Sequence, residues 1–349
     1  MLGTTAAAVA RYDGALSAVP NPDVLLAPLT TQEAVLSSRI EGTQATMGEV
    51  LEFEAGRPPQ SSERRDDIQE VVNYRRAMAH AEEMLEAVPL SLRVVRDAHR
   101  ILMSGARGAS KSPGEYRRLP VWIGPPGCSI DEATFVPIGA DQLVEAMSAW
   151  ERFIHAPAPD RLLQIAILHA EFEALHPFLD GNGRLGRMLI PLLLWQYGLI
   201  REPMFFISAH LESNRDAYYE GLLSVSRDND WTGWCRFFME AMTAQAEDNL
   251  NRAEGIIDLY DEMKTRIADM TKSRYAIHAL DWIFQYPIFS STHFVTNAGV
   301  PAKSARRVLN TLCRGGLLET LVAASGRRPA ILAFPDVLRV AEGDVVSGA

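Results

Sequence analysis

The sequence predicts a mainly α-helical protein with one short β-hairpin, followed by a small winged helix-turn-helix domain. Apolar residues recur at helical spacing through most of about the first 270 residues, and a single extended stretch interrupts them. The region after about residue 270 then changes in both pattern and charge. A length of 349 residues allows two or three domains, and 47% hydrophobic with 22% charged residues is typical of a globular chain.

Helical spacing runs from about residue 31 to residue 87. Thr30 and Glu33 stand at the spacing of a capping box, which predicts that a helix starts there, and Gly42 offers its end. Further helices are predicted over residues 141–155, 160–175, 183–197, 215–226 and 231–265.

The extended stretch is Val121–Gly127, which begins with β-branched and aromatic residues and ends in glycine and proline. This composition predicts a strand that closes in a turn. Residues 134–136 are the expected partner strand. The sequence therefore predicts one short hairpin in an otherwise helical region.

The C-terminal region predicts a separate domain. Helices are expected over residues 275–286, 291–297 and 301–313, followed by two strands within residues 317–334. A helix, a short helix, a longer helix and a β-wing follow one another in a winged helix-turn-helix. From residue 271 to residue 341 there are nine basic and three acidic residues, a net charge of +6, so the rest must carry −16 to give the total of −10.

Cysteine usage and apolar runs exclude several classes of protein. The three cysteines, Cys128, Cys235 and Cys313, lie far apart without a CxxC pair, which argues against a disulfide framework and against a zinc site. The N-terminus lacks the basic region and apolar core of a signal peptide. The longest apolar run is far shorter than the roughly 20 residues of a membrane span. We expect a soluble cytoplasmic protein without a membrane partner.

The most informative stretch runs from His176 to Arg187 and joins two apolar helices. Gly181 and Gly183 flank Asn182, so the backbone can bend there and present N–H groups to an anion. The next helix starts at this point, with its positive dipole end on the same spot. Arg184 and Arg187 are three residues apart on one face of that helix, where both can reach one anion. The pattern predicts a phosphate-binding turn.

Two further residues supply chemistry to this turn. Asp180 precedes it and is placed to hold a magnesium ion that bridges two phosphates, and His176 can serve as a base. Taken singly, each feature has an ordinary structural explanation, as a turn, a loop histidine or a solvated helix face. Their combination within twelve residues favours a phosphate-transfer site.

This stretch resembles the motif HPFx[D/E]GNGRxxR of the Fic (filamentation induced by cAMP) family. Every fixed position is matched, by His176, Pro177, Phe178, Asp180, Gly181, Asn182, Gly183, Arg184 and Arg187. The resemblance extends over roughly residues 30 to 240. It implies a Fic-type helical bundle and a protein adenylyltransferase, which moves AMP from ATP to a Ser, Thr or Tyr hydroxyl of a protein, itself included, and releases pyrophosphate.

The resemblance also implies roles for individual residues. His176 would take the proton of the target hydroxyl, Asp180 would hold Mg²⁺, and Tyr219 would pack on adenine. The residues expected to bind ATP and its phosphates are Gly181, Asn182, Gly183, Arg184, Leu185, Gly186, Arg187 and Tyr219.

The hairpin would act as a flap that docks the target backbone by strand addition. The docking residues are Val121, Trp122, Ile123 and Gly124. Relatives commonly have a second glycine where this chain has Pro125 and Pro126. A proline removes an N–H donor, so we expect the pairing of this flap with a target to be altered or shortened.

A second motif resembles the inhibitory motif [S/T]xxxE[G/N] of the same family, with Ser37, Glu41 and Gly42 at the fixed positions. Helical spacing places Ser37 and Glu41 on one face. A lone Glu near a helix end is usually a surface charge. Beside a complete phosphate loop, however, Glu41 is expected to pair with Arg187 and to fill the place of the ATP γ-phosphate. An alternative is that Glu41 orients a water for the reverse reaction, the removal of AMP from a modified protein.

A different hypothesis is a nucleotide-sensing regulator that binds DNA through the C-terminal domain. Its support is Lys303, Arg306 and Arg307, at positions i, i+3 and i+4 of the expected recognition helix, and Arg327 with Arg328 at the wing tip. Winged helices also serve in protein docking and dimerisation, so a protein partner stays open as an alternative. The resemblance itself implies a homodimer with an apolar helical interface.

These motifs divide the chain into four parts. They are an N-terminal helical region over residues 1–95 with the inhibitory helix at about 31–42, a catalytic core over 96–245, a helical linker over 246–270 and a winged-helix domain over 271–349.

Overall fold

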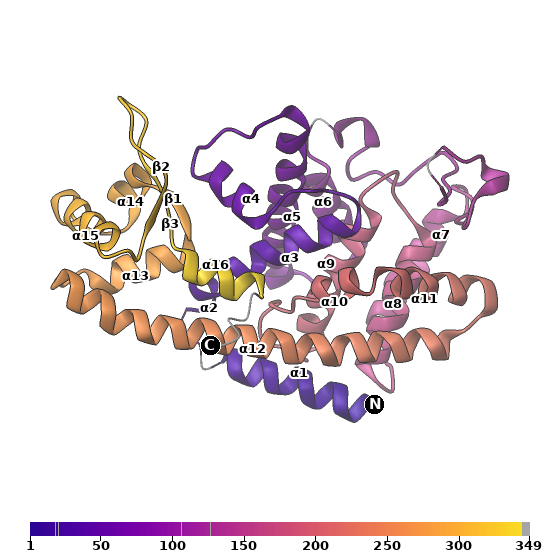
Figure 1. Ribbon diagram of the computed structural model, residues 1–349. Helices are drawn as coiled ribbons and strands as arrows, with labels where there is room; N and C mark the ends of the chain where they lie inside the picture. The colour runs from indigo at the N-terminus through magenta and orange to yellow at the C-terminus, as the bar shows by residue number, and fades with distance from the viewer. Residues whose placement is uncertain (18, 20, 106, 126, 344–349) are drawn as a thin grey trace. The chain divides into compact units, whose positions relative to one another are not determined.

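Helices dominate the computed structural model, which describes residues 1–343 except 18, 20, 106 and 126 (Figure 1). The helices before the phosphate loop are α1 (Leu2–Leu16), α2 (Pro22–Leu25), α3 (Ala27–Ile40), α4 (Met47–Glu54), α5 (Ser62–Ala87), α6 (Leu92–Leu102), α7 (Leu143–His155) and α8 (Arg161–Leu175). Those after it are α9 (Asn182–Gln196), α10 (Ser208–Ser213), α11 (Arg215–Asp228), α12 (Trp231–Thr271), α13 (Ala276–Gln285), α14 (Ser291–Asn297), α15 (Ala302–Arg314) and α16 (Pro335–Glu342).

Two compact units share these elements, and each is assembled from separate stretches of the chain. The first unit consists of Met1–Asp13, Leu36–Thr43 and Gln69–Glu247. The second consists of Gly14–Val35, Gln44–Ile68 and Asp248–Ala349. The four-part division predicted from the sequence stays a prediction, and its last six residues, 344–349, lie outside the described residues.

In the first unit, α8 is the central helix and packs against α7, α9 and α11. Its apolar residues are buried, among them Ile165, Leu168 and Phe172. Asp160 caps its first turn by accepting the Leu163 N–H at 3.0 Å, which explains why the helix starts there. The helices predicted over residues 141–228 are confirmed with small shifts at their ends.

The second unit contains the sheet, a three-stranded antiparallel arrangement in the order β1 (Ile288–Ser290), β3 (Ile331–Ala333), β2 (Glu319–Val322). Ala333 pairs with Ile288 on one side and with Glu319 on the other. Helices α14 and α15 pack on each other in the same unit. The three predicted helices and two predicted strands of this region are confirmed, whereas β1 and α16 had no sequence prediction.

One local prediction was wrong. Thr30 does not cap a helix, because α3 starts at Ala27 and the Thr30 N–H already donates to the Leu26 carbonyl at 3.1 Å. A capping box does occur at the start of α4, where the Thr46 hydroxyl accepts the Glu49 N–H. Gly42, with φ of 102°, follows the end of α3 as expected.

The predicted hairpin is reduced to one antiparallel bridge, between Ile123 and Phe135. The Ile123 N–H donates to the Phe135 carbonyl at 2.9 Å, and the Ile123 carbonyl accepts the N–H groups of Thr134 and Phe135. A short 3₁₀ turn, Ile130–Glu132, occupies part of the intervening loop. Pro126, at the tip of the predicted turn, lies outside the described residues.

Among the described residues, no helix has both the length and the apolar composition that a membrane crossing requires.

Candidate active site

The phosphate loop leaves α8 through a left-handed residue and enters α9 through a second one. His176 is the C-cap of α8 with φ of 46°, and Gly181 precedes α9 with φ of 79°. The Asn182 side chain fixes the turn between them: its Oδ1 accepts the Phe178 N–H and its Nδ2 donates to the Phe178 carbonyl, both at 2.9 Å. Gly181 therefore has the conformational role expected of it, and Asn182, which was expected to bind phosphate, also fixes the turn.

Two buried side chains, Arg117 and His99, contact the phosphate loop, and the sequence identified neither of them. Arg117 donates from Nε to the His176 carbonyl at 2.9 Å, and its N–H donates to the Pro177 carbonyl. His99 stacks on Phe178, with 3.7 Å between the ring centroids. Burial lowers the pKa of His99 to about 4, so its ring is neutral at physiological pH.

The start of α9 forms the anion cradle. Its first intrahelical bond runs from the Leu185 N–H to the Gly181 carbonyl at 3.1 Å, so the N–H groups of residues 182–184 belong to the unpaired first turn. Side chains cap α4, α8 and α14, but the N-cap of α9 is Gly181 and supplies none. The N-cap residue therefore leaves these N–H groups to an anion from elsewhere.

The Glu41 carboxylate lies at this helix end. A Cβ built on Gly183 would collide with Glu41 Oε1 and would lie 2.9 Å from Arg187 Nη1. Only glycine at position 183 lets the carboxylate and the guanidinium approach the backbone this closely. Glu41 thus occupies space that the first turn of α9 offers to a phosphate.

Arg187 pairs with Glu41, the contact that the family resemblance implied, and Ser37 bonds to the same guanidinium. Arg187 Nη2 donates to Glu41 Oε1 and to the Ser37 carbonyl, both at 2.7 Å, and its Nε donates to Ser37 Oγ at 3.0 Å. Burial opposes ionisation of Glu41, but the Arg187 charge and hydrogen bond outweigh it and lower the pKa of Glu41. The pair is therefore ionic, with Arg187 fully buried.

Arg184 does not share this carboxylate, although both arginines were expected to reach one anion. It donates to Glu70 Oε2 at 2.7 Å and lies 3.3 Å from Asp180 Oδ1. Its side chain is 5% exposed. Glu70, on α5, is a third residue of the site, after Arg117 and His99, that the motif does not show.

Burial shifts the pKa values of the ionisable side chains beside the start of α9. Burial lowers the pKa of His176 below its usual value, which favours the neutral imidazole that a base requires. The Glu173 carboxyl lies against Gly186, and burial raises its pKa to about 8, so it is protonated at neutral pH. His169 forms hydrogen bonds with the Gly186 carbonyl and with the Tyr218 hydroxyl.

Asp180 has the environment of a magnesium ligand. Its side chain is 44% exposed, and its Oδ1 accepts the Gly181 N–H at 2.6 Å. Among the described residues, no group of three or more His, Cys, Asp or Glu side chains gathers around a metal position. A single carboxylate fits Mg²⁺, which usually takes one or two protein carboxylates, substrate phosphates and water.

The other predicted site residues have different surroundings. Tyr219 is 40% exposed and packs on Tyr218 with 5.3 Å between the ring centroids. Leu185 has a fully buried side chain and an N–H that is already bonded within α9. Trp122 and Ile123 of the flap are exposed.

In the second unit, the basic residues singled out by the sequence lie on one face of α15. Lys303, Arg306 and Arg307 are exposed, whereas Val308 and Leu312 are buried. None of the three basic side chains forms an ion pair with another described residue.

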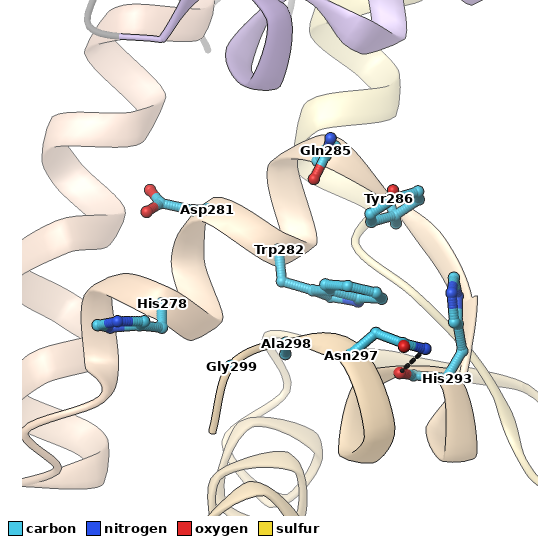
Figure 2. Close-up of a pocket in the computed structure, with 9 residues that line it drawn as sticks. All are labelled: His278, Asp281, Trp282, Gln285, Tyr286, His293, Asn297, Ala298 and Gly299. Atoms are coloured by element: carbon cyan, nitrogen blue, oxygen red, sulfur yellow. Dashed lines mark hydrogen bonds between the residues drawn. The ribbon is translucent and has the colours of Figure 1, made fainter. Parts of the chain in front are cut away.

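The second unit also contains a groove of about 580 Å³ beside α13 and α14 (Figure 2). Its rings pack on one another: Trp282 lies 4.4 Å from Tyr286 and 4.8 Å from His293 between ring centroids. Its carboxylate, Asp281, accepts the Tyr260 hydroxyl at 2.6 Å. The residues around it are His278, Asp281, Trp282, Gln285, Tyr286, His293, Asn297, Ala298 and Gly299.

The fold is that of a mainly helical protein with a small antiparallel sheet, and comparison with known proteins gives the family. Residues 89–194 match the Fic/DOC family, and residues 1–83 match its N-terminal region. The chain belongs to the Fic/DOC family.

Individual relatives agree with this assignment. Protein adenylyltransferase Fic of Drosophila yakuba is 24% identical over 205 residues, which cover 58% of this chain and 38% of that protein. The chain therefore aligns with well under half the length of this curated relative. A Fic family protein from Desulfovibrio desulfuricans G20 shares the fold with a TM-score of 0.58 at 18% identity, over 95% of each chain. A Fic domain containing signaling protein from Bacteroides thetaiotaomicron has a TM-score of 0.56 at 18% identity, over 72% of this chain and 97% of that one.

Proposed function

We propose that this protein transfers AMP from ATP to a hydroxyl side chain of a protein, itself included, and that Glu41 restrains the reaction. One observation carries the proposal: the Glu41 carboxylate lies in the anion cradle of a complete Fic loop, 2.7 Å from Arg187 Nη2. An anion of the chain thus marks where an anion of the substrate would bind.

The transfer begins at His176. The neutral imidazole accepts the proton of the target hydroxyl as the hydroxyl oxygen attacks the α-phosphorus of ATP. The bond between this phosphorus and the bridging oxygen of pyrophosphate breaks, and pyrophosphate leaves with the electron pair. Arg117 holds the backbone of the base by its bond to the His176 carbonyl. Tyr219, exposed and resting on Tyr218, offers a ring face for adenine.

The negative charge of the triphosphate is balanced by groups already in place. The N–H groups of residues 182–184 have no partner within α9 and would donate to a phosphate, and Arg187 would bind a phosphate when Glu41 leaves. Asp180 would hold Mg²⁺, and that ion would neutralise phosphate charge when bound.

Glu41 restrains this reaction by occupancy and charge. With the carboxylate seated, Arg187 is neutralised and the start of α9 is filled, so ATP cannot place a phosphate there in the reactive pose. Removal of the carboxylate frees both the guanidinium and the space.

The experiment measures incorporation of label from α-labelled ATP with MgCl₂ into the protein and into a cell lysate. We expect Glu41→Gly to raise incorporation at least tenfold, because a charge-assisted bond of about 1.5–3 kcal/mol is removed. Glu41→Gly combined with His176→Ala should be inactive. The control is Glu86→Gly, at an exposed position in the last turn of α5.

An inert Glu41→Gly protein would refute restraint by this residue. The reverse reaction is separated by a second assay, in which wild type and Glu41→Gly are given a protein that already carries AMP. Release of AMP by wild type alone would mean that Glu41 acts as a base toward water.

A second candidate function is DNA binding by the C-terminal helices. It is favoured by the exposed basic face of α15, whose opposite face is buried. Duplex DNA affinity should fall steeply with salt, and replacing Lys303, Arg306 and Arg307 by alanine should flatten that slope by up to about 0.9 per phosphate contact. The control removes the same charge from exposed arginines elsewhere, by Arg76→Ala, Arg93→Ala and Arg118→Ala. Equal losses in both variants would exclude α15 as the binding face.

A further inference from the structure

We propose that His99 is a positioning residue that ties the base of the flap to the phosphate loop, an inference that rests on the proposed AMP transfer. It lies outside the Fic motif, on the buried face of α6. Its two ring nitrogens have different partners, in two segments that must cooperate in the reaction.

The geometry specifies one tautomer of the ring. The Gly114 N–H donates to His99 Nδ1 at 2.8 Å, so Nδ1 is an acceptor. Nε2 therefore carries the hydrogen, and it donates to the Asp180 carbonyl at 2.9 Å. With no exposed surface, the ring cannot exchange either partner for water.

Each partner belongs to a functional segment. Gly114 begins the segment that leads to the flap, and its carbonyl is held in turn by Arg96 Nε at 2.8 Å. Asp180 carries the carboxylate proposed to hold Mg²⁺. The His99 ring also stacks on Phe178. The same side chain therefore holds the loop at two points, the Phe178 ring and the Asp180 carbonyl.

No other single side chain supplies this combination. Asparagine can place an acceptor near the position of Nδ1, glutamine can place a donor near Nε2, and phenylalanine keeps only the stacking surface. The three substitutions therefore separate the functions of the ring. His99 thus couples the place where the target docks to the place where phosphate charge is balanced.

The test uses the full chain with Glu41→Gly, so that transfer is measurable, and adds His99→Asn, His99→Gln or His99→Phe. Binding of a non-hydrolysable ATP analogue with MgCl₂ is measured by calorimetry, and AMP transfer from α-labelled ATP is measured against ATP concentration. We expect His99→Asn and His99→Phe to weaken analogue binding by roughly tenfold, because both lose the buried hydrogen bond from Nε2 to the Asp180 carbonyl. His99→Gln should bind the analogue within about threefold of the parent and lose mainly the transfer rate.

The control is Val95→Ala, which removes buried volume from α6 without touching either hydrogen bond. It should lower the melting temperature and leave analogue affinity unchanged. The proposal is overturned if analogue affinity falls equally in the Asn and Gln variants, or if it follows melting temperature across all four proteins. Calorimetry measures how the His99 contacts affect analogue affinity even if the Glu41→Gly protein transfers no AMP. Failure of the proposed function is therefore distinguished from failure of this proposal.

Discussion

Arg187 Nη2 donates to Glu41 Oε1 across 2.7 Å, but only one of the two side chains has access to water. Arg187 has no exposed surface, whereas 33% of the Glu41 side chain is exposed. The fully buried guanidinium is held by the packing around it, whereas the partly exposed carboxylate already has access to water. We therefore expect the pair to open from the Glu41 side, by movement at the end of α3.

Ser37 should contribute less to restraint than Glu41. Its hydroxyl is an uncharged acceptor that receives one hydrogen bond from Arg187 Nε at 3.0 Å. Its backbone carbonyl can still accept from Arg187 Nη2 in any variant. Ser37→Ala should raise labelling from α-labelled ATP by about two- to tenfold, since it removes roughly 0.5–1.5 kcal/mol. A larger increase than that of Glu41→Gly would contradict a subsidiary role for Ser37.

Gly183→Ala should depend on the residue at position 41. The added methyl group collides with Glu41 Oε1 in the wild-type chain, and with Glu41→Gly its closest neighbour is Arg187 Nη1 at 2.9 Å. We expect a loss of about 1–3 kcal/mol of unfolding free energy in the first background and less than half of that in the second. Urea unfolding of the four proteins gives the coupling, and equal losses would show that Glu41 does not occupy the cradle.

Glu70→Gln should change the metal requirement. Arg184 then loses its closest carboxylate and should pair more strongly with Asp180, which competes with Mg²⁺ for that side chain. In the Glu41→Gly background, the MgCl₂ concentration for half-maximal transfer should rise about threefold or more. The matched control is Glu115→Gln, which breaks an exposed pair with Arg96 and should leave this concentration unchanged.

The pH dependence of stability should reveal Glu173. Burial raises the pKa of its carboxyl from 4.5 to about 8, so between these values the unfolded chain has lost a proton that the folded chain keeps. Stability from this group is therefore lost as pH rises through that range. Glu173→Gln should gain stability over wild type between about pH 5 and pH 9, on the order of a few kcal/mol by denaturant unfolding. A difference that does not vary with pH would show that Glu173 is already ionised; Glu254→Gln, at an exposed position, is the control.

The phosphate loop was predictable because its residues are local. Gly181, Asn182 and Gly183 act through their own backbone and through Phe178, all within a few positions of one another. The long helices were predictable for a similar reason, since 3.6-residue periodicity is expressed over many turns. The pairing of Glu41 with Arg187, in contrast, followed from a family resemblance and not from periodicity.

What the sequence missed depends on distant partners. His99 meets Asp180 at a separation of 81 residues, and Glu70 meets Arg184 at 114 residues. No local sequence pattern predicts a contact between residues so far apart in the chain. Strand β1 has three residues, too few for an alternation to show, and Thr30 was misread because a capping-box spacing also occurs inside a helix. The magnesium ion, the homodimer and the cytoplasmic location stay predictions.

The left-handed backbone conformation of His176 sets stability against activity at this position. A φ of 46° at the end of α8 is a conformation that glycine or asparagine adopts at least cost, yet an imidazole stands there. Selection for heat resistance alone would favour glycine at position 176 and would discard the base in doing so. His176→Gly, and not His176→Ala, is therefore the inactive variant expected to unfold at the higher temperature. If a variant evolved for higher stability keeps histidine at this position, that retention would indicate selection for the reaction.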